Sequence, residues 1–196
     1  TIPSGVDDSI QRIERSYGKM GWSHNITSRV GTGAAATIAN QVNLAYNGFG
    51  QVVKSRQDHA AAADTDTISV GYTFGDGDLM SRLNTLTYPQ GSSVVYTYAT
   101  GLNSNISRIS SLTVSSADIV EYSYLGYNTP VIVDYSADPE IRLDYTKGSD
   151  SGSETYKSFD RFGRVTLHNW VRTVSETDVD IIKIGLTDRK STRLNS

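Results

Sequence analysis

The stretch Phe159-Asp160-Arg161-Phe162-Gly163-Arg164-Val165 decides the fold, because the chain contains nearly the same sequence elsewhere. Tyr46-Asn47-Gly48-Phe49-Gly50-Gln51-Val52 has the same form: an aromatic residue, Asp or Asn, any residue, Phe, Gly, a polar residue and Val. Tyr17-Gly18-Lys19-Met20-Gly21 is a weaker third copy. Internal repetition of this kind indicates an array of similar units rather than one irregular domain.

A second, longer repeat lies in the middle of the chain. Residues 81–98 align without a gap with residues 107–124, at an offset of 26 residues between Ser81 and Ser107 and again between Tyr96 and Tyr122. A shorter match, Val70–Phe74, places Tyr72 24 residues before Tyr96. The residues that recur in this repeat are Tyr72, Arg82, Tyr96, Tyr98, Arg108, Tyr122 and Tyr124.

Each 26-residue unit has the pattern of two strands. A first strand, Arg-aliphatic-x-x-Leu-Thr, leads into a turn such as Pro89-Gln90-Gly91, and the second strand carries the paired tyrosines. Tyr96 and Tyr98 share a face, because side chains alternate along a strand. A single hairpin is marginally stable in water, so we expect each hairpin to bury its Tyr and Leu side chains against the next.

Short alternating runs continue on both sides of this repeat. Val42, Leu44 and Tyr46 alternate with polar residues, and Asn47-Gly48 then predicts a tight turn into a strand over residues 51–56. Further strands are predicted at residues 9–17, 25–30, 130–135, 141–145, 165–170 and 178–184. The sequence therefore predicts an all-β fold, in which antiparallel β-hairpin repeats form one continuous curved ribbon or sheet.

Composition agrees with this fold and narrows the classes of function. The 196 residues include 12 Tyr, 17 Gly and no Cys, and the net charge is −3. The absence of Cys excludes disulfides and thiolate metal sites. The small net charge does not indicate a nucleic-acid or membrane partner, and no apolar run approaches the roughly 20 residues that span a bilayer.

We expect the chain to be an internal piece of a longer protein, with five or six repeats over residues 1–187. It begins at Thr1 in the middle of a pattern, and no signal peptide opens it. Residues 188–196 can be encoded by a string that looks like a common short-read sequencing adapter. We therefore expect a non-native tail there, although a genuine basic tail is the alternative.

Candidate catalytic and metal-binding residues are scattered. His24, His59 and His168 lack the spacing of metal ligands, and the acidic residues at 64, 66, 76 and 78 lack the spacing of a calcium loop. Asp134 and Asp160 are isolated carboxylates, and a glycosidase pair stays open. No Gly-x-Ser-x-Gly elbow or phosphate-binding glycine loop occurs. The sequence thus predicts no catalytic, cofactor or metal site, and Ala137–Glu140 is interpreted as a turn.

The combination of aromatic-Asp-x-Phe-Gly-Arg-Val motifs with Tyr-x-Tyr strands resembles the RHS/YD repeats of bacterial surface and secreted proteins. The motif residues that carry the resemblance are Tyr46, Asn47, Phe49, Gly50, Phe159, Asp160, Phe162, Gly163 and Arg164. Asn47 and Gln51 depart from the usual Asp and Arg. The resemblance implies a ribbon that spirals into a shell, secretion or cell-surface display, and other repeats of the same chain as partners.

Two functions follow as expectations from this resemblance. In the first, the segment is the wall of a shell that encloses or displays a C-terminal toxin or effector, and it performs no catalysis itself. There Asp160 with Arg164, and Asn47 with Gln51, hold the turns, while Phe49 and Phe162 pack repeat on repeat. In the second, a Tyr-rich face binds carbohydrate or a neighbouring cell; exposure of Tyr96, Tyr98, Tyr122 and Tyr124 distinguishes the two.

Overall fold

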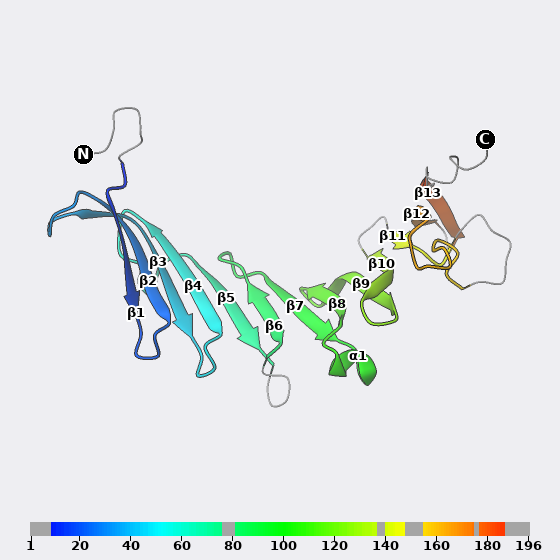
Figure 1. Ribbon diagram of the computed structural model, residues 1–196, viewed down its shortest axis with the longest axis horizontal. Helices are drawn as coiled ribbons and strands as arrows, with labels where there is room; N and C mark the ends of the chain where they lie inside the picture. Colours follow the sequence, from blue (N-terminus) through cyan, green and yellow to red (C-terminus); the bar gives the residue numbers. More distant parts are fainter. Residues whose placement is uncertain (1–8, 76–80, 137–139, 148–154, 175–176, 187–196) are drawn as a thin grey trace, which may run out of the picture. The chain divides into compact units, whose positions relative to one another are not determined.

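The computed structural model describes residues 9–75, 81–136, 140–147, 155–174 and 177–186, and it confirms the all-β fold. Among these residues the one α-helix is α1 (Leu102–Asn105). Figure 1 labels the strands. They are β1 (Arg12–Tyr17), β2 (Ser23–Val30), β3 (Thr37–Tyr46), β4 (Val52–His59), β5 (Ser69–Phe74), β6 (Leu83–Thr87), β7 (Ser93–Tyr98), β8 (Ile109–Val114), β9 (Ala117–Leu125), β10 (Thr129–Tyr135), β11 (Ile141–Asp144), β12 (Leu167–Val174) and β13 (Thr177–Gly185).

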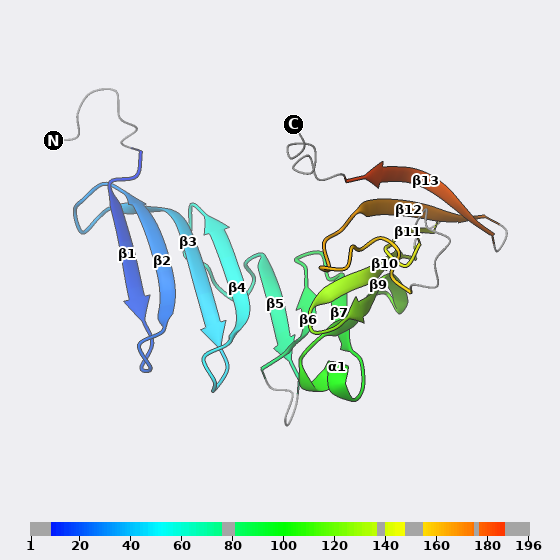
Figure 2. The same cartoon turned by 45° about the vertical axis from the view of Figure 1, so that its right-hand side comes forward.

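Chain order and sheet order are the same, so the strands form an up-and-down antiparallel meander from β1 to β13. Two compact units divide the chain, Thr1–Val95 and Tyr96–Ser196. Within the first unit, β1 to β6 lie side by side in Figures 1 and 2. The expected 137–139 turn and the 188–196 tail lie outside the described residues. The connections within the β6–β7 and β8–β9 hairpins are short, whereas β11 and β12 are separated by a long connection.

The register of the strand pairs reproduces the 26-residue repeat. In the first copy, Leu86 lies opposite Val94 in the β6–β7 pair. In the second copy, Leu112 lies opposite Val120 in the β8–β9 pair, which is the same pairing moved by the repeat length. The repeat seen in the sequence is therefore also a repeat of hydrogen-bonding register.

In the first unit the sheet has one apolar and one polar face. Ile26 lies opposite Val42, so these two share a face, and Leu44 and Tyr46 follow Val42 on it at intervals of two. The other face carries polar side chains that bond across the strands. Gln41 donates to Thr27 at 2.7 Å, Asn43 donates to Asn25 at 2.8 Å, and Arg56 donates to Asn43 at 2.9 Å.

The second unit repeats this division more sharply. Leu143 lies opposite both Val133 and Trp170, and Val133 lies opposite Tyr122, so these four side chains share an apolar, aromatic face. Asp134 lies opposite Arg142 on the other face, which is charged. Tyr135 stacks on Trp170 at 6.3 Å, and Tyr122 on Tyr124 at 6.2 Å, between ring centroids. Such same-face pairs stabilise sheets.

Burial is far lower than the sequence suggested. The buried apolar side chains among the described residues are Val120, Val131, Tyr145 and Val171. The expectation that each hairpin buries its Tyr and Leu face against the next is therefore wrong in extent. Neighbouring hairpins join edge to edge through backbone hydrogen bonds, so most side chains of the described strands contact same-face neighbours and stay partly exposed. The six repeat tyrosines are half-buried; they are Tyr46, Tyr72, Tyr96, Tyr98, Tyr122 and Tyr124.

The two copies of the repeat differ at their turns. The first copy has Gly91, with φ +90°, in a five-residue turn over residues 88–92. The second copy has Ala117 at that position, and it uses a two-residue turn instead, between Val114 and Ala117. Ser115 and Ser116 both take left-handed φ values there, +51° and +67°. Left-handed conformations are unfavourable for residues with a Cβ and suit Asn-Gly best.

Replacing Ser115→Asn together with Ser116→Gly will therefore raise the free energy of unfolding, by about 1–2 kcal/mol, because it removes this backbone strain. Urea denaturation followed by circular dichroism measures the change. The matched control is Ser92→Gly, in the other turn, where the serine has no left-handed φ. Equal effects at the two turns would contradict the assignment of strain to Ser115 and Ser116.

Candidate functional site

Four turns in the described residues share one geometry. In each, the N–H of the first residue donates to the carbonyl of the fifth, and the N–H of the fourth donates to the carbonyl of the first. The fourth residue is always a glycine with left-handed φ: Gly21 (+77°), Gly50 (+82°), Gly91 (+90°) and Gly163 (+75°). This is a β-turn followed by a glycine bulge. The turns span residues 18–22, 47–51, 88–92 and 160–164.

The first residue of two of these turns also bonds through its side chain. Asn47 Oδ1 accepts from the N–H groups of Phe49 (3.0 Å) and Gln51 (3.1 Å). Asp160 Oδ1 accepts from Phe162 (2.8 Å) and Arg164 (2.9 Å) in the same way. Side-chain bonds then close each turn, from Asn47 to Gln51 (2.6 Å) and from the Arg164 guanidinium to Asp160 (2.7 Å).

These bonds explain why Asn replaces Asp without changing the turn, since both residues supply the same acceptor oxygen. The bond from the Arg164 N–H is the main cause that holds the pKa of Asp160 below its ordinary value. The predicted hydrogen bonds across both turns are therefore present. The prediction that Asn47-Gly48 forms the tight turn is wrong, because the turn has five residues and its left-handed position is Gly50.

Phe49 and Phe162 do not pack repeat on repeat, contrary to the sequence-based expectation. Their side chains are 70% and 68% exposed, because the third residue of each turn projects from the end of the hairpin. Arg161 and Arg164 lie over the Phe162 ring, at 4.7 and 5.5 Å from its centroid. The largely exposed Phe162 ring thus contacts neighbouring cations and not another repeat.

The aromatic residue before the turn has the packing role instead. Tyr46 donates its hydroxyl to the carbonyl of Ser23 at 2.7 Å, and its ring lies 5.4 Å from that of Trp22. Trp22 also covers Gly50 so closely that a Cβ built there would lie 2.8 Å from the indole. Gly50 is therefore needed for its φ and for this close approach. One turn thereby seats the indole of the neighbouring hairpin.

The residues of the 26-residue repeat hold strands together. Arg108 lies over the Tyr124 ring at 5.1 Å and bonds the carbonyl of Gly126, and the Tyr124 hydroxyl donates to Ile109 O at 2.8 Å. Burial is the main cause that raises the pKa of Tyr122 and of Tyr124. Tyr96 and Tyr98 lie half-buried on β7, and Tyr72 and Arg82 are half-buried in the first unit.

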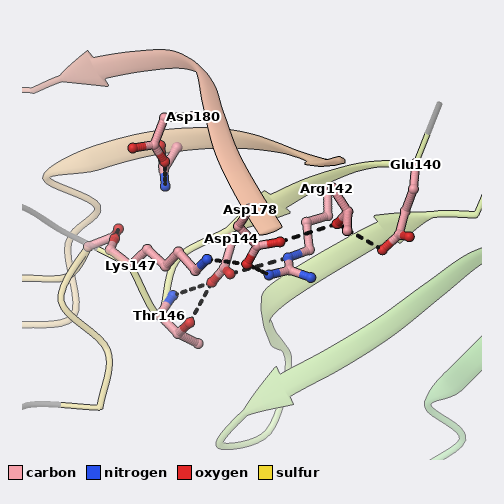
Figure 3. Close-up of polar contacts among 10 residues, drawn as sticks. Glu140, Arg142, Asp144, Thr146, Lys147, Asp178 and Asp180 are labelled. Carbon is pink, nitrogen blue, oxygen red and sulfur yellow. Dashed lines mark hydrogen bonds and ion pairs between the residues drawn. The ribbon is translucent and has the colours of Figure 1, made fainter. Parts of the chain in front are cut away.

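A charged network lies on the second unit (Figure 3). Asp178 accepts bonds from both Arg142 and Lys147, which hold its pKa below the ordinary value, the Lys147 bond being the larger cause. Asp144, only 2% exposed, pairs with Arg142 at 3.4 Å and accepts from the Thr146 N–H at 2.9 Å. These bonds tie β13 to β11 across the intervening strand.

Asp134 is a carboxylate of this charged face that lies in an unfavourable environment. It lies directly between Glu121 of β9 and Arg142 of β11, and its buried Oδ1 accepts no hydrogen bond from the described residues. Burial first, and Glu140 second, raise its pKa above the ordinary value. A desolvated carboxylate among acidic neighbours is a feature of some active sites, although ion-pair networks produce it too.

The other candidate residues do not come together. His24 and His59 are exposed in the first unit, whereas His168 in the second bonds the Tyr145 hydroxyl at 2.8 Å. Asp64 caps a local turn by accepting from the Asp66 N–H at 3.0 Å, while residues 76 and 78 lie outside the described part. Across the described ranges, no three His, Asp or Glu groups are placed to hold a metal ion.

Two of the open hollows that the described residues form lie on the second unit. One, of about 450 Å³, lies beside the 160–164 turn and is lined by Leu125, Thr155, Tyr156, Phe159, Asp160, Arg161 and Gly163. The other, of about 290 Å³, is lined by Ile106, Ser107, Arg108, Ile109, Tyr124, Tyr127 and Asn128. Within the described residues no helix has the length and apolar character to cross a membrane.

Comparison with protein-family models and with curated proteins finds no match.

The sequence analysis missed three features of these sites. The 88–92 turn belongs to the same class as the 160–164 turn, and the signal was its glycine at the fourth position. Trp22 occupies the fifth position of the 18–22 turn. The first residue of this turn is Gly18 instead of Asp or Asn, so the motif was weak there and the packing role of Trp22 was not predicted. The Asp178 network joins strands far apart in sequence.

Replacing Gly50→Ala will destabilise the protein more than Gly163→Ala, although both glycines hold the same position in the same turn. Each change costs about 1–2 kcal/mol for a left-handed Ala, and Gly50→Ala adds about 1–3 kcal/mol because its Cβ displaces Trp22. At Gly163, by contrast, a Cβ would meet no atom of the described residues within 4 Å. Urea denaturation of both variants measures the difference, and equal losses would contradict the role assigned to Trp22.

Two changes in the charged network will have opposite effects on stability. Asp134 has a higher pKa in the folded state than its unfolded pKa near 3.8. Its protonated form therefore stabilises the folded protein below the unfolded pKa, and this stabilisation is lost as the pH rises through the folded pKa. Asp134→Asn therefore raises the melting temperature at pH 7, and the gain shrinks in acid.

Asp178 has a lowered pKa, so its contribution is present above the unfolded value near 3.8 and is lost as pH falls through the folded value. Asp178→Asn consequently lowers the melting temperature at pH 7, and this loss also shrinks in acid. Thermal denaturation from pH 3 to pH 7 measures both variants, with Asp66→Asn as an exposed control. Shifts of the same sign at pH 7 would refute the electrostatic interpretation.

Proposed function

We propose that this chain is a structural segment of a β-repeat wall, in which a protein of the RHS/YD type encloses or displays a C-terminal effector. The observation that carries the proposal is the recurring turn. In the 47–51 turn the glycine and the preceding aromatic residue join one hairpin to the next, since Trp22 packs on both Gly50 and Tyr46. The motif that repeats is thus used for assembly.

The distribution of charge supports a role without catalysis. Polar side chains on both units bond to neighbours on nearby strands, as Gln41 does to Thr27 and as Arg142 does to Asp178. The desolvated Asp134 lies on a sheet face and not in either hollow. A catalytic site would require such groups to converge on a pocket. The wall acts by exclusion and converts no substrate.

The test is to express the complete reading frame that encodes this segment. A wall predicts a hollow particle by electron microscopy, with the C-terminal domain resistant to added protease. Gly50→Ala should loosen the wall and increase cleavage of that domain, whereas Gly163→Ala should increase it less. A particle with no interior, or an effector cleaved as readily as in isolation, would refute the proposal.

A second candidate, a carbohydrate-binding or adhesion module, is favoured by one observation. The hollow of about 290 Å³ combines the 74% exposed Tyr127 with Arg108 and Asn128, which can donate hydrogen bonds to sugar hydroxyls. The Tyr96, Tyr98, Tyr122 and Tyr124 side chains are half-buried, which weakens their expected role as the binding face. An open array that binds glycans through Tyr127 would support this candidate over the wall.

A further inference from the structure

Every residue of strand β13 is exposed, although the strand is nine residues long. Among the described strands it pairs with β12 alone, so the backbone groups of its other edge have no strand partner within the described residues. Four of its apolar side chains are about half exposed: Val179, Ile181, Ile182 and Ile184. A long apolar edge of this kind favours pairing with another strand.

The bulge of β13 places its two opposite charges on one face. Asp180 and Lys183 form an ion pair at 2.5 Å, although side chains three residues apart lie on opposite faces of a regular strand. The extra residue at the bulge, Ile181, accounts for this. Val179 precedes the first charge and Ile184 follows the second, and both lie on the opposite face.

This arrangement is complementary to itself when the strand is reversed. If a second β13 runs antiparallel, with the centre between Ile181 and Ile182, each Asp180 lies opposite the Lys183 of the other copy. Each Val179 then lies opposite the other copy's Ile184. Cross-strand pairs of opposite charge and of β-branched side chains both stabilise a sheet. A shift of one residue in either direction places Asp180 opposite an isoleucine and breaks both ion pairs.

We propose that β13 is the interface of a symmetric dimer, in which the β13 strands of two copies of this chain pair antiparallel in that register. The ion pair within each strand then joins a cluster of four alternating charges across the symmetry axis. The valine and isoleucine side chains of the two copies cover each other on the opposite face. Such a contact uses the same surface of both copies, so it closes at two subunits. This interface does not depend on the wall function.

The other outermost described strand, β1, is less suited to this contact. Its Glu14 already pairs with Arg12 and Arg29, and Ile13 is its one aliphatic residue. Pairing of β13 with the β1 of another copy would also be head to tail, which produces open-ended assemblies and not a dimer. The oligomeric state therefore distinguishes the two modes of pairing.

The register is tested by cysteine cross-linking of the whole chain, which has no Cys of its own. Val179→Cys together with Ile184→Cys should give a disulfide-linked dimer on mild oxidation, because directly opposite residues lie within disulfide reach. The matched control is Val179→Cys alone. In the proposed register its two copies are offset by five residues along the strands, roughly 15 Å, and they should not cross-link.

The charges are tested by sedimentation velocity over a range of micromolar concentrations, where the unaltered chain should show a monomer–dimer equilibrium. Lys183→Asp places carboxylates opposite each other twice and should raise the dissociation constant at least about tenfold. Adding Asp180→Lys exchanges the two charges and should restore the dimer. Ile119→Lys, at an exposed apolar position of β9, is the control that should leave the dissociation constant unchanged.

Circular dichroism and urea denaturation establish that each variant is folded, and the cross-linking test holds even where a charge variant is not. The proposal is overturned by a chain that stays monomeric at all concentrations, or by species larger than a dimer. Equal cross-linking by Val179→Cys alone, or a charge-exchanged variant that folds and stays monomeric, would overturn the register.

Discussion

The five-residue turn with a left-handed glycine is the constraint on which four of the described hairpins depend, and in two of them a side-chain oxygen that accepts from two backbone N–H groups reinforces it. Asn47 Oδ1 and Asp160 Oδ1 each satisfy donors that would otherwise lack a partner at the end of a hairpin. This fixes a five-residue turn, and the left-handed glycine then returns the chain in register. Because side chains alternate along a strand, a slip of one residue would exchange the apolar and polar faces. Where this turn connects two strands, it therefore determines which face their side chains occupy.

A single-layer sheet has few ways to exclude water, and this chain uses two. On the apolar face, aromatic rings lie against rings of the same strand or of a nearby one, as Tyr135 does on Trp170. On the opposite face, polar groups satisfy one another, so that Asn43 and Gln41 become buried without an apolar layer above them. Buried polar groups cost free energy when they lack hydrogen bonds, and these two have them. Asp134 Oδ1, by contrast, is buried without a bond from the described residues.

The fold could be predicted from the sequence because its signals are local. Period-two alternation and glycines at fixed turn positions act within a few residues, and the 26-residue offset shows which hairpins are equivalent. The register of the strand pairs follows from these signals. Burial could not be predicted, because alternation identifies a face without saying whether a second layer covers it. For the same reason the sequence assigned the packing role to the wrong residue. Phe49 was expected to pack, but it projects into solvent, and Trp22 packs on Gly50 instead. Asp178 could not be linked to Arg142, since 36 residues separate them.

The outermost of the described strands, β1 and β13, carry features that restrict how a further strand could pair with them. An edge strand exposes unpaired N–H and C=O groups, and charges or bulges on it oppose further pairing. β1 carries Arg12, Glu14 and Arg15 within six residues. β13 combines Asp178, Asp180 and Lys183 with a bulge, since Trp170 pairs with Ile182 and Val171 with Asp180, which leaves Ile181 without a direct partner. Four half-exposed apolar side chains on β13 favour association with a further strand, and the charges and the bulge of β13 restrict which strand can pair with it.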